Sequence, residues 1–333
     1  MGWNLFGRNS KSGVAVTEAG SGTSGKGEES DVLKTWWEQG RYVLIAREKG
    51  RFKAHPGVDA FATKSADILE TNLRFVPKGT IRLARTLNDY RGSPDEEVEV
   101  APFLIDTFAV SNARYQKFVD AGGYESSDWW SEQGWEWRMR GGYRSDSPVT
   151  EPRYWHSARL GQERRGNPVV GVSWYEAEAY CNWLAAQIET KQITLHVIRN
   201  GKPETGVPAL DSIEVRLPTE AEWAAFCGGG EGDRYPWDPP NGPATADRQA
   251  ILARANTQEA GLNGPSPVAM YPLGASRPYG LMELAGNVWE WNADWYGGSQ
   301  SSRVLRGGAY YRSAGGARCG ARYGYRPDDS SQV

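Results

Sequence analysis

The chain has 333 residues, and its 38 basic and 41 acidic side chains give a net charge of −3. This balance lacks the basic patch expected for binding to nucleic acid or to an anionic membrane, and no apolar run approaches the roughly 20 residues of a membrane span. Three cysteines are too few for a disulfide framework, which favours a reducing compartment. The N terminus lacks the apolar core of a secretory signal, so the sequence predicts a cytoplasmic protein.

Glycine, proline and tryptophan mark the composition. The chain contains 40 Gly, 19 Pro and 15 Trp, and its glycine content clearly exceeds the usual share of about 7%. This mixture favours many turns anchored by large aromatic side chains, and it disfavours long helices. The sequence therefore predicts a loop-rich α+β fold with few helices.

Three regions follow one another along the chain. Residues 1–30 are small and polar and cannot bury enough apolar surface to offset ordering, which predicts a flexible N-terminal segment. In residues 31–72, apolar side chains recur at helical spacing after a candidate N-cap at Asp31, and we interpret this stretch as an adaptor region. Residues 73–333 are predicted to form one continuous domain.

The domain begins with strand patterns and a capped helix. Residues 73–83 predict a strand, a turn and a second strand, and residues 98–105 predict another strand. Ser111 stands before an amphipathic pattern that predicts a helix over 111–120.

Two further helices have reciprocal cap signatures. Ser173 stands three residues before Glu176, and Thr219 stands three residues before Glu222, so each hydroxyl and each carboxylate can satisfy a helix N-terminal amide. After these helices, residues 236–303 are predicted to be mostly loop.

Tryptophan is concentrated in residues 121–137, which contain four of these side chains. They could form a carbohydrate-stacking surface, but we favour core anchors because indole rings dominate core packing. The glycine-rich run 228–233 lacks the Lys and Ser/Thr of a phosphate loop, so no nucleotide is expected.

Five motifs occur in order and together resemble the formylglycine-generating-enzyme (sulfatase-modifying factor) domain. They are NPVVGVSWYEAEAYCNWLA (167–185), VRLPTEAEWAAF (215–226), YPWD (235–238), PYGLMELAGNVWEW (278–291) and RVLRGGA (303–309). The resemblance implies a C-type-lectin-like fold. It leaves three functions open, namely copper-dependent cysteine oxidation, non-haem iron chemistry, and ligand binding by variable proteins of diversity-generating retroelements.

The copper chemistry of the family requires two cysteines shortly after the RGG turn, because soft thiolates hold Cu(I). No cysteine stands between Ala309 and Arg318. Cys319 matches a non-catalytic family cysteine, and Cys181 and Cys227 are expected to be buried small hydrophobic residues. No copper site is therefore expected.

The iron chemistry of the family requires a set of histidine ligands, and no haem or iron site is expected here. His55 lacks a suitably spaced Glu, His156 lies in a predicted loop and His196 lies in a predicted strand. Together with the missing cysteine pair, this pattern predicts that the chain is not an enzyme.

The C-terminal segment resembles the variable region of retroelement-diversified proteins. In that family, adenines in a template are copied into any base. The resemblance therefore implies that a diversified Asn codon cannot become a codon for Glu, Lys, Gln, Met or Trp. None of these five residue types occurs from Ala309 to Ser331, although they make up about a fifth of the chain before it. The segments 317–319, Arg322 and 327–328 keep the family's constant frame.

The positions between these frame residues are the candidate ligand-binding set. They are Tyr311, Arg312, Ser313, Gly316, Ala321, Tyr323, Gly324, Tyr325, Arg326, Asp329, Ser330 and Ser331. Tyrosine gives rigid contact area, arginine gives directional donors, and Ser and Gly give adaptability, as in antibody loops.

These residues predict an exposed surface that binds an unknown target, expected to be a protein. Tyr310 is the exception and is expected in the core, because the family has Trp there. The alternative is a catalytically inactive family domain with a fixed structural or signalling partner. A strand hairpin buried in the core would also explain the aromatic pattern of the segment.

The resemblance also implies a structural calcium site in the GNVWEW element. The ligands would be the carbonyls of Gly286 and Val288 and the carboxylate of Glu290, with Glu283 nearby. Oxygen-only ligation suits Ca²⁺. A buried carboxylate that bonds loop amides is the alternative role for Glu290.

Overall fold

The computed structural model describes two compact units, residues 1–63 and 64–333. The described residues are 32–37, 45, 49–52, 55–62, 65, 72–83, 96–142, 146–190, 196–199, 202–204, 214–228, 232–277 and 279–331. The flexible segment predicted for residues 1–30 and the N-cap predicted at Asp31 lie outside them.

The first unit has a small core of its own. Residues 32–37 are helical, and a 3-10 helix, η1, spans Lys49–Phe52. Leu33, Ile45 and Phe52 are fully buried in one cluster. These apolar side chains explain why part of the predicted adaptor region is ordered.

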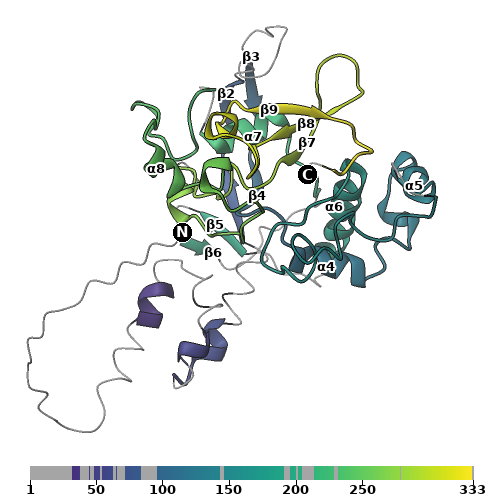
Figure 1. Ribbon diagram of the computed structural model, residues 1–333, viewed down its shortest axis with the longest axis horizontal. Helices are drawn as coiled ribbons and strands as arrows, with labels where there is room; N and C mark the ends of the chain where they lie inside the picture. Colours follow the sequence, from purple (N-terminus) through teal and green to yellow (C-terminus); the bar gives the residue numbers. More distant parts are fainter. Residues whose placement is uncertain are drawn as a thin grey trace, which may run out of the picture. The chain divides into compact units, whose positions relative to one another are not determined.

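The second unit contains three small sheets among its described residues, and Figure 1 shows them between the helices. The first sheet has the order β4–β1–β5–β6 and is mixed, because β1 pairs with β4 antiparallel and with β5 parallel. The second sheet is the antiparallel pair β2–β3, and the third has the antiparallel order β7–β8–β9. The strands are β1 (Asn72–Val76), β2 (Gly79–Leu83), β3 (Glu96–Val100), β4 (Phe103–Asp106), β5 (His196–Arg199), β6 (Lys202–Glu204), β7 (Glu290–Trp295), β8 (Arg303–Arg306) and β9 (Arg322–Tyr325).

The helices of this unit are short apart from α6, as the composition predicts. α6 lies against α4 and α5 (Figure 1). The helices are α4 (Asn112–Asp120), α5 (Glu132–Met139), α6 (Trp174–Glu189), α7 (Glu220–Cys227) and α8 (Arg248–Leu252), with 3-10 turns η2 (Ser127–Trp129), η3 (Gln258–Ala260), η4 (Pro272–Gly274) and η5 (Ala314–Ala317). The fold is thus α+β and loop-rich, with few helices and small sheets.

All three predicted helix starts are confirmed. The Ser111 hydroxyl accepts the amide of Arg114, and both reciprocal caps form at Ser173 and Thr219. α7 ends at Gly228, whose φ of 121° is available to glycine at little cost. Local hydrogen-bond chemistry therefore sets these boundaries.

The strand predictions need two corrections. The stretch 98–105 is not one strand, because β3 ends at Val100 and β4 begins at Phe103, and the two strands belong to different sheets. The predicted loop 236–303 contains β7, which pairs with β8 across the sheet. Pairing with a distant segment decides both outcomes, so local patterns do not show them.

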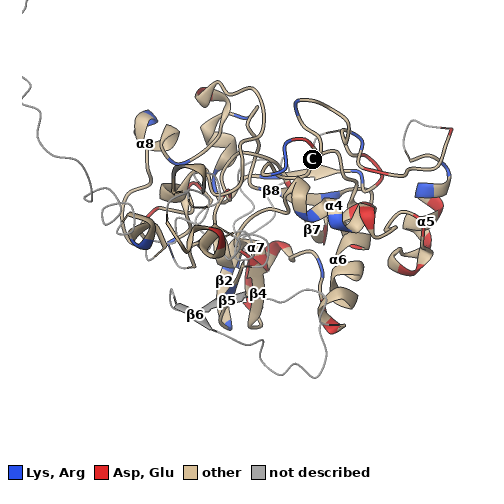
Figure 2. Cartoon of the chain, turned by 90° about the horizontal axis from the view of Figure 1, so that it is seen from below, with Lys and Arg blue, Asp and Glu red and all other residues tan. Residues whose placement is uncertain are grey.

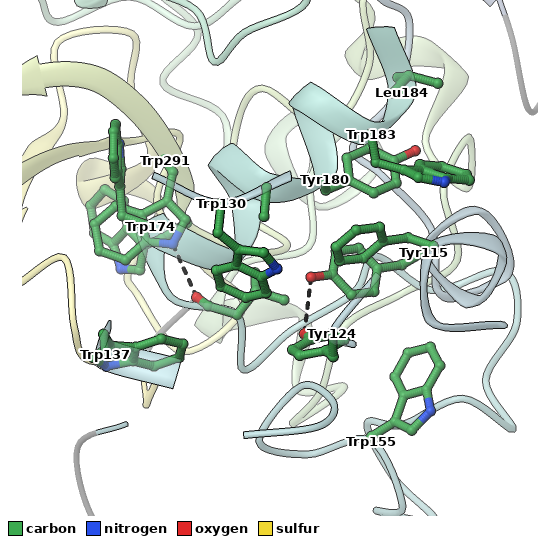
Figure 3. Packing of buried hydrophobic residues seen from close by; sticks show 14 of the residues in the cluster. Tyr115, Tyr124, Trp130, Trp137, Trp155, Trp174, Tyr180, Trp183, Leu184 and Trp291 are labelled. Carbon is green, nitrogen blue, oxygen red and sulfur yellow. Dashed lines mark hydrogen bonds between the residues drawn. The ribbon is translucent and has the colours of Figure 1, made fainter. Parts of the chain in front are cut away.

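A cluster of aromatic side chains forms the main core (Figure 3). Trp130 and Trp137 are buried, which confirms the core-anchor interpretation for two of the four tryptophans in 121–137. The Tyr115 and Tyr124 hydroxyls lie 3.1 Å apart, as the dashed line in Figure 3 marks, and Tyr124 donates to the Glu176 carboxyl at 2.7 Å. The polar atoms of this core are thus paired.

Cys227 and Cys319 form a disulfide, with Cα atoms 5.9 Å apart. The expectation that Cys227 is a free buried thiol is therefore wrong. The bond joins the end of α7 to a residue 92 positions later, a pairing that spacing along the chain does not show. Cys181 is a free thiol and is buried, as expected.

Acidic and basic residues are interspersed along some of the described elements, as on α4 and α5 (Figure 2). No helix among the described residues is both long and apolar enough to cross a membrane.

Candidate ligand-binding surface

Strand β9 carries the centre of the candidate surface. Successive strand side chains point to opposite faces, so Arg322 and Gly324 share one face while Tyr323 and Tyr325 share the other. Arg322 is buried, whereas Tyr323 is 39% exposed. The strand thus presents Tyr323 and Tyr325 toward solvent, while the buried Arg322 holds its other face to the protein.

Aromatic rings from two strands meet on that outer face. Tyr323 stacks on Trp289 with ring centroids 6.0 Å apart, and Tyr325 lies 6.3 Å from Trp291. The two tyrosine rings lie 6.2 Å from each other. We call Trp289, Trp291, Tyr311, Tyr323 and Tyr325 the aromatic face. Because both tryptophans are buried, the tyrosines form its outer layer.

Arg312 lies at the edge of the aromatic face. Its guanidinium carbon is 5.6 Å from the ring centroids of Tyr311 and Tyr323 and 5.9 Å from that of Trp289. Such contacts hold a cation by the negative faces of the rings. Burial raises the pKa of the Tyr311 phenol well above its ordinary value, so this neighbour stays neutral.

A buried ionic network lies beneath β9. Glu220 of α7 accepts Arg306 of β8 at 2.7 Å and Arg322 of β9 at 2.7 and 3.0 Å. Each of the three residues is at most 3% exposed. The network joins one helix to two strands, and it gives the frame residue Arg322 a structural role beneath the exposed tyrosines.

Residues outside the C-terminal segment hold it by its main chain. The Tyr235 hydroxyl donates to the Ala314 carbonyl at 2.9 Å, and the Glu259 carboxylate accepts the Ala314 amide at 2.9 Å. The Gln258 amide donates to the Arg312 carbonyl at 2.9 Å. None of these bonds uses a side chain of residues 309–331.

The same holds at the far end of the segment. The Trp137 indole donates to the Asp328 carbonyl at 2.9 Å, and the Trp174 amide donates to the Pro327 carbonyl at 3.1 Å. At the RGG turn, a Cβ on Gly308 would lie 2.6 Å from the Gly316 carbonyl oxygen. These main-chain bonds do not depend on the side chains of the candidate set, whereas at the C-terminal end the Asp329 side chain accepts the Ser331 amide at 2.9 Å.

The candidate residues fall into three classes of exposure. Ser313, Tyr323 and Arg326 are exposed. The half-buried ones are Tyr311, Arg312, Gly316, Gly324, Tyr325, Asp329 and Ser331. The buried ones are Ala321 and Ser330.

Three of these positions differ from the expected contact surface. Ala321 is 0% exposed and Ser330 is 9% exposed, because both backbones turn inward beside the core. A Cβ on Gly324 would lie 2.5 Å from the Tyr296 ring, so this position faces inward as well. Tyr310, expected in the core, is half-buried and packs edge-on against Tyr311 at 5.1 Å.

A cleft of about 530 Å³ adjoins the end of β9. Arg326 and Asp328 line it from the C-terminal segment, and α5 and Tyr175 line it from outside that segment. The sequence analysis did not predict that α5 and Tyr175 line a cleft beside the segment, or that Trp289 and Trp291 pack beneath its tyrosines. The tryptophans of the GNVWEW motif were the available signal.

The expected calcium ligands lie in a turn with left-handed backbone. Glu283, Gly286 and Asn287 have φ values of 62°, 81° and 64°. Glu283 is buried, its Oε1 accepts the Ala269 amide at 2.7 Å, and its Oε2 has no partner. A buried carboxylate oxygen that accepts no hydrogen bond is an unsatisfied acceptor, and a bound cation could satisfy it.

The neighbouring carboxyl fits the same cation. Glu290 is half-buried and accepts the Trp223 indole N–H at 3.1 Å. Burial raises the pKa of Glu290 to about 7, and burial together with Glu290 raises that of Glu283 to about 8. No three His, Cys, Asp or Glu side chains cluster among the described residues, so a metal here would need main-chain oxygens such as that of Val288. This donor set suits a hard cation.

The histidines are not assembled into a site in the described part of the chain. His156 is exposed and bonds Glu151 at 2.9 Å, whereas His196 lies on β5. His55 lies in the first unit.

Residues 61–333 match the family described as the sulfatase-modifying factor enzyme 1-like domain. The chain belongs to this family. The match covers the whole of the aromatic face, the Glu220 network and the candidate calcium turn.

Several relatives share about a third of their residues with the matched part. A hercynine oxygenase from Mycobacterium tuberculosis is 32% identical over 65% of this chain and 47% of its own length. An inactive C-alpha-formylglycine-generating enzyme 2 from Bos taurus is 32% identical over 78% of this chain and 85% of its own length. A formylglycine-generating enzyme from Thermomonospora curvata is 31% identical over 66% and 70%. The chain spans about half the length of the hercynine oxygenases it matches.

Two solved structures are also similar. Treponema denticola variable protein 1 is 22% identical, with a TM-score of 0.49 over 77% of this chain and 90% of its own length. PvdO from Pseudomonas aeruginosa is 20% identical, with a TM-score of 0.49 over 77% and 89%.

The prediction that the chain is not an enzyme is overturned by these relatives. Hercynine oxygenases and formylglycine-generating enzymes are enzymes, and they match this chain at 30–32% identity. The missing cysteine pair bears on one chemistry only, because a thiolate pair is the requirement of Cu(I) and not of catalysis in general.

Proposed function

We propose that this chain binds a protein partner through the aromatic face, Arg312 and the adjoining exposed residues, and that a diversity-generating retroelement diversifies this surface. The fold supplies a rigid support on which side chains can change while the backbone stays in place. Tyrosine and arginine on such a support give rigid contact area and directional hydrogen bonds.

The observation that carries the proposal is the way the C-terminal segment is held. Its main chain is bonded by Tyr235, Glu259 and Trp137, and its buried anchor is the frame residue Arg322. Side chains at the exposed positions are not needed for these bonds. The absence of five residue types from Ala309 to Ser331 supports the same proposal.

A stability comparison tests whether exposed positions are free to change. Tyr323→Ser is expected to lower the free energy of unfolding by about 1 kcal/mol, because it loses one aromatic pair at the surface. Its buried stacking partner is the matched control, and Trp289→Ser is expected to cost about 3–5 kcal/mol. Urea denaturation monitored by circular dichroism measures both. Equal losses would show that Tyr323 is part of the core and would contradict the proposal.

Sequencing further copies of the gene tests diversification itself. Substitutions are expected to concentrate at Tyr311, Arg312, Ser313, Tyr323 and Tyr325 and to spare the frame. Copies that keep the tyrosines and differ only by scattered silent changes would instead favour a fixed partner.

We also propose that the turn containing Glu283, Gly286, Val288 and Glu290 binds Ca²⁺ as a structural ion. At a Ca²⁺ concentration 100 times Kd, the free energy of unfolding is expected to rise by about 2.7 kcal/mol. Thermal melts in Ca²⁺ and in a chelator measure this rise. Glu283→Gln is expected to remove it, and Glu259→Gln, outside the turn, to keep it. Identical melting temperatures in Ca²⁺ and chelator would refute the site.

A further inference from the structure

Among the arginines of residues 309–331 that the structure describes, Arg312 and Arg318 each have a buried Nε without a hydrogen-bond partner. Arg322 bonds Glu220 at 2.7 and 3.0 Å, and Arg326 bonds Asp328 at 2.6 and 2.9 Å. The Arg318 guanidinium carbon lies 5.8 Å from the ring centroid of Tyr235, which is not part of the aromatic face. Arg312 has only aromatic rings around it, and its Nε is buried without an acceptor.

The surroundings of Arg312 make an anionic partner more favourable than at an ordinary surface arginine. The side chain is half-buried, and its guanidinium carbon lies 5.6 to 5.9 Å from three ring centroids. The rings border this half-buried side chain, and a charge pair at such a position is screened less than one in open solvent. They also limit the side-chain freedom that pairing would otherwise cost.

We infer that Arg312 is the recognition point for a carboxylate that the partner presents, an acidic side chain or a C-terminal carboxylate that is seated among Trp289, Tyr311 and Tyr323. The planar guanidinium fork matches a carboxylate in a bidentate arrangement. An aromatic or apolar group beside that carboxylate would lie on the exposed rings. This inference rests on the proposed function and names the chemistry of the partner.

Benzoate is the probe, since it joins a carboxylate to an aromatic ring, and benzamide is its neutral counterpart of the same shape. The Nε–H resonance of Arg312, assigned by its loss in Arg312→Gln, is followed by nuclear magnetic resonance. Benzoate is expected to shift it saturably with a Kd on the order of 1–10 mM. Benzamide is expected to bind at least tenfold more weakly, and Arg312→Lys to keep part of the affinity for benzoate.

Arg165→Gln removes an equal charge from an exposed position outside the face and is expected to leave benzoate binding unchanged. Equal binding of benzoate and benzamide, or benzoate binding that survives Arg312→Gln, would overturn the inference. A lower Kd for methyl phosphate than for benzoate would contradict a carboxylate and would indicate that the partner presents a phosphate. If no probe binds while the Tyr323 and Trp289 variants behave as expected, the inference fails and the proposed function stands.

Discussion

Replacing Glu220 by Gln is expected to lower the free energy of unfolding by about 3–5 kcal/mol. Glu220 is the carboxylate shared by Arg306 and Arg322, and all three side chains are at most 4% exposed. Gln keeps the shape but removes the negative charge that both buried guanidinium groups face. Urea denaturation at neutral pH measures the loss.

The matched control is Glu214→Gln. Glu214 also faces an arginine, Arg216, at 3.5 Å, but its side chain is 81% exposed. Exposed pairs contribute about 0–1 kcal/mol, so this variant is expected to unfold close to the wild-type midpoint. A similar loss in both variants would mean that burial does not amplify the Glu220 network. Because the network supports β9, near-ultraviolet circular dichroism is also expected to change in Glu220→Gln.

Breaking the Cys227–Cys319 bond is expected to destabilise the domain by about 4–5 kcal/mol, since the bond closes a loop of 92 residues. The double variant Cys227→Ser with Cys319→Ser removes it, and reduction of the wild type by dithiothreitol does so without substitution. The melting temperature measures both.

Cys181→Ala is the control for reduction and for cysteine replacement in general. Its thiol is buried and free, so it is expected to change the melting temperature little and to leave the response to dithiothreitol intact. A wild-type melting temperature that is the same with and without dithiothreitol would refute a stabilising role for the bond. That result would also restore the sequence-based expectation of a free thiol at Cys227.

Helix starts were predictable because their chemistry is local. Ser111, Ser173 and Thr219 each satisfy amides within three residues of themselves, and that spacing is visible in the chain. The family resemblance then placed the RGG turn and the C-terminal segment, because several motifs occurred in order.

Sidedness was not predictable from those patterns. Gly324 occupies a variable place along the chain, yet it faces inward, because it shares a face of strand β9 with the buried Arg322. Ala321, which directly precedes the strand, is buried as well. Tyr323 and Tyr325, on the opposite face, pack against Trp289 and Trp291, which come from a stretch predicted to be loop. A strand that pairs with a distant segment shows its faces only when its register is known.

Amino-acid order alone established the family, the capped helices and the position of the segment that carries the candidate surface. These depend on short-range hydrogen bonding and on motif order. Three-dimensional packing decided which side chains of that segment reach solvent, that the single carboxylate of Glu220 pairs with two arginines, and that Cys227 meets Cys319. The last two depend on contacts between residues roughly 90 to 100 positions apart, and such contacts exist only after the chain has closed the loops between them.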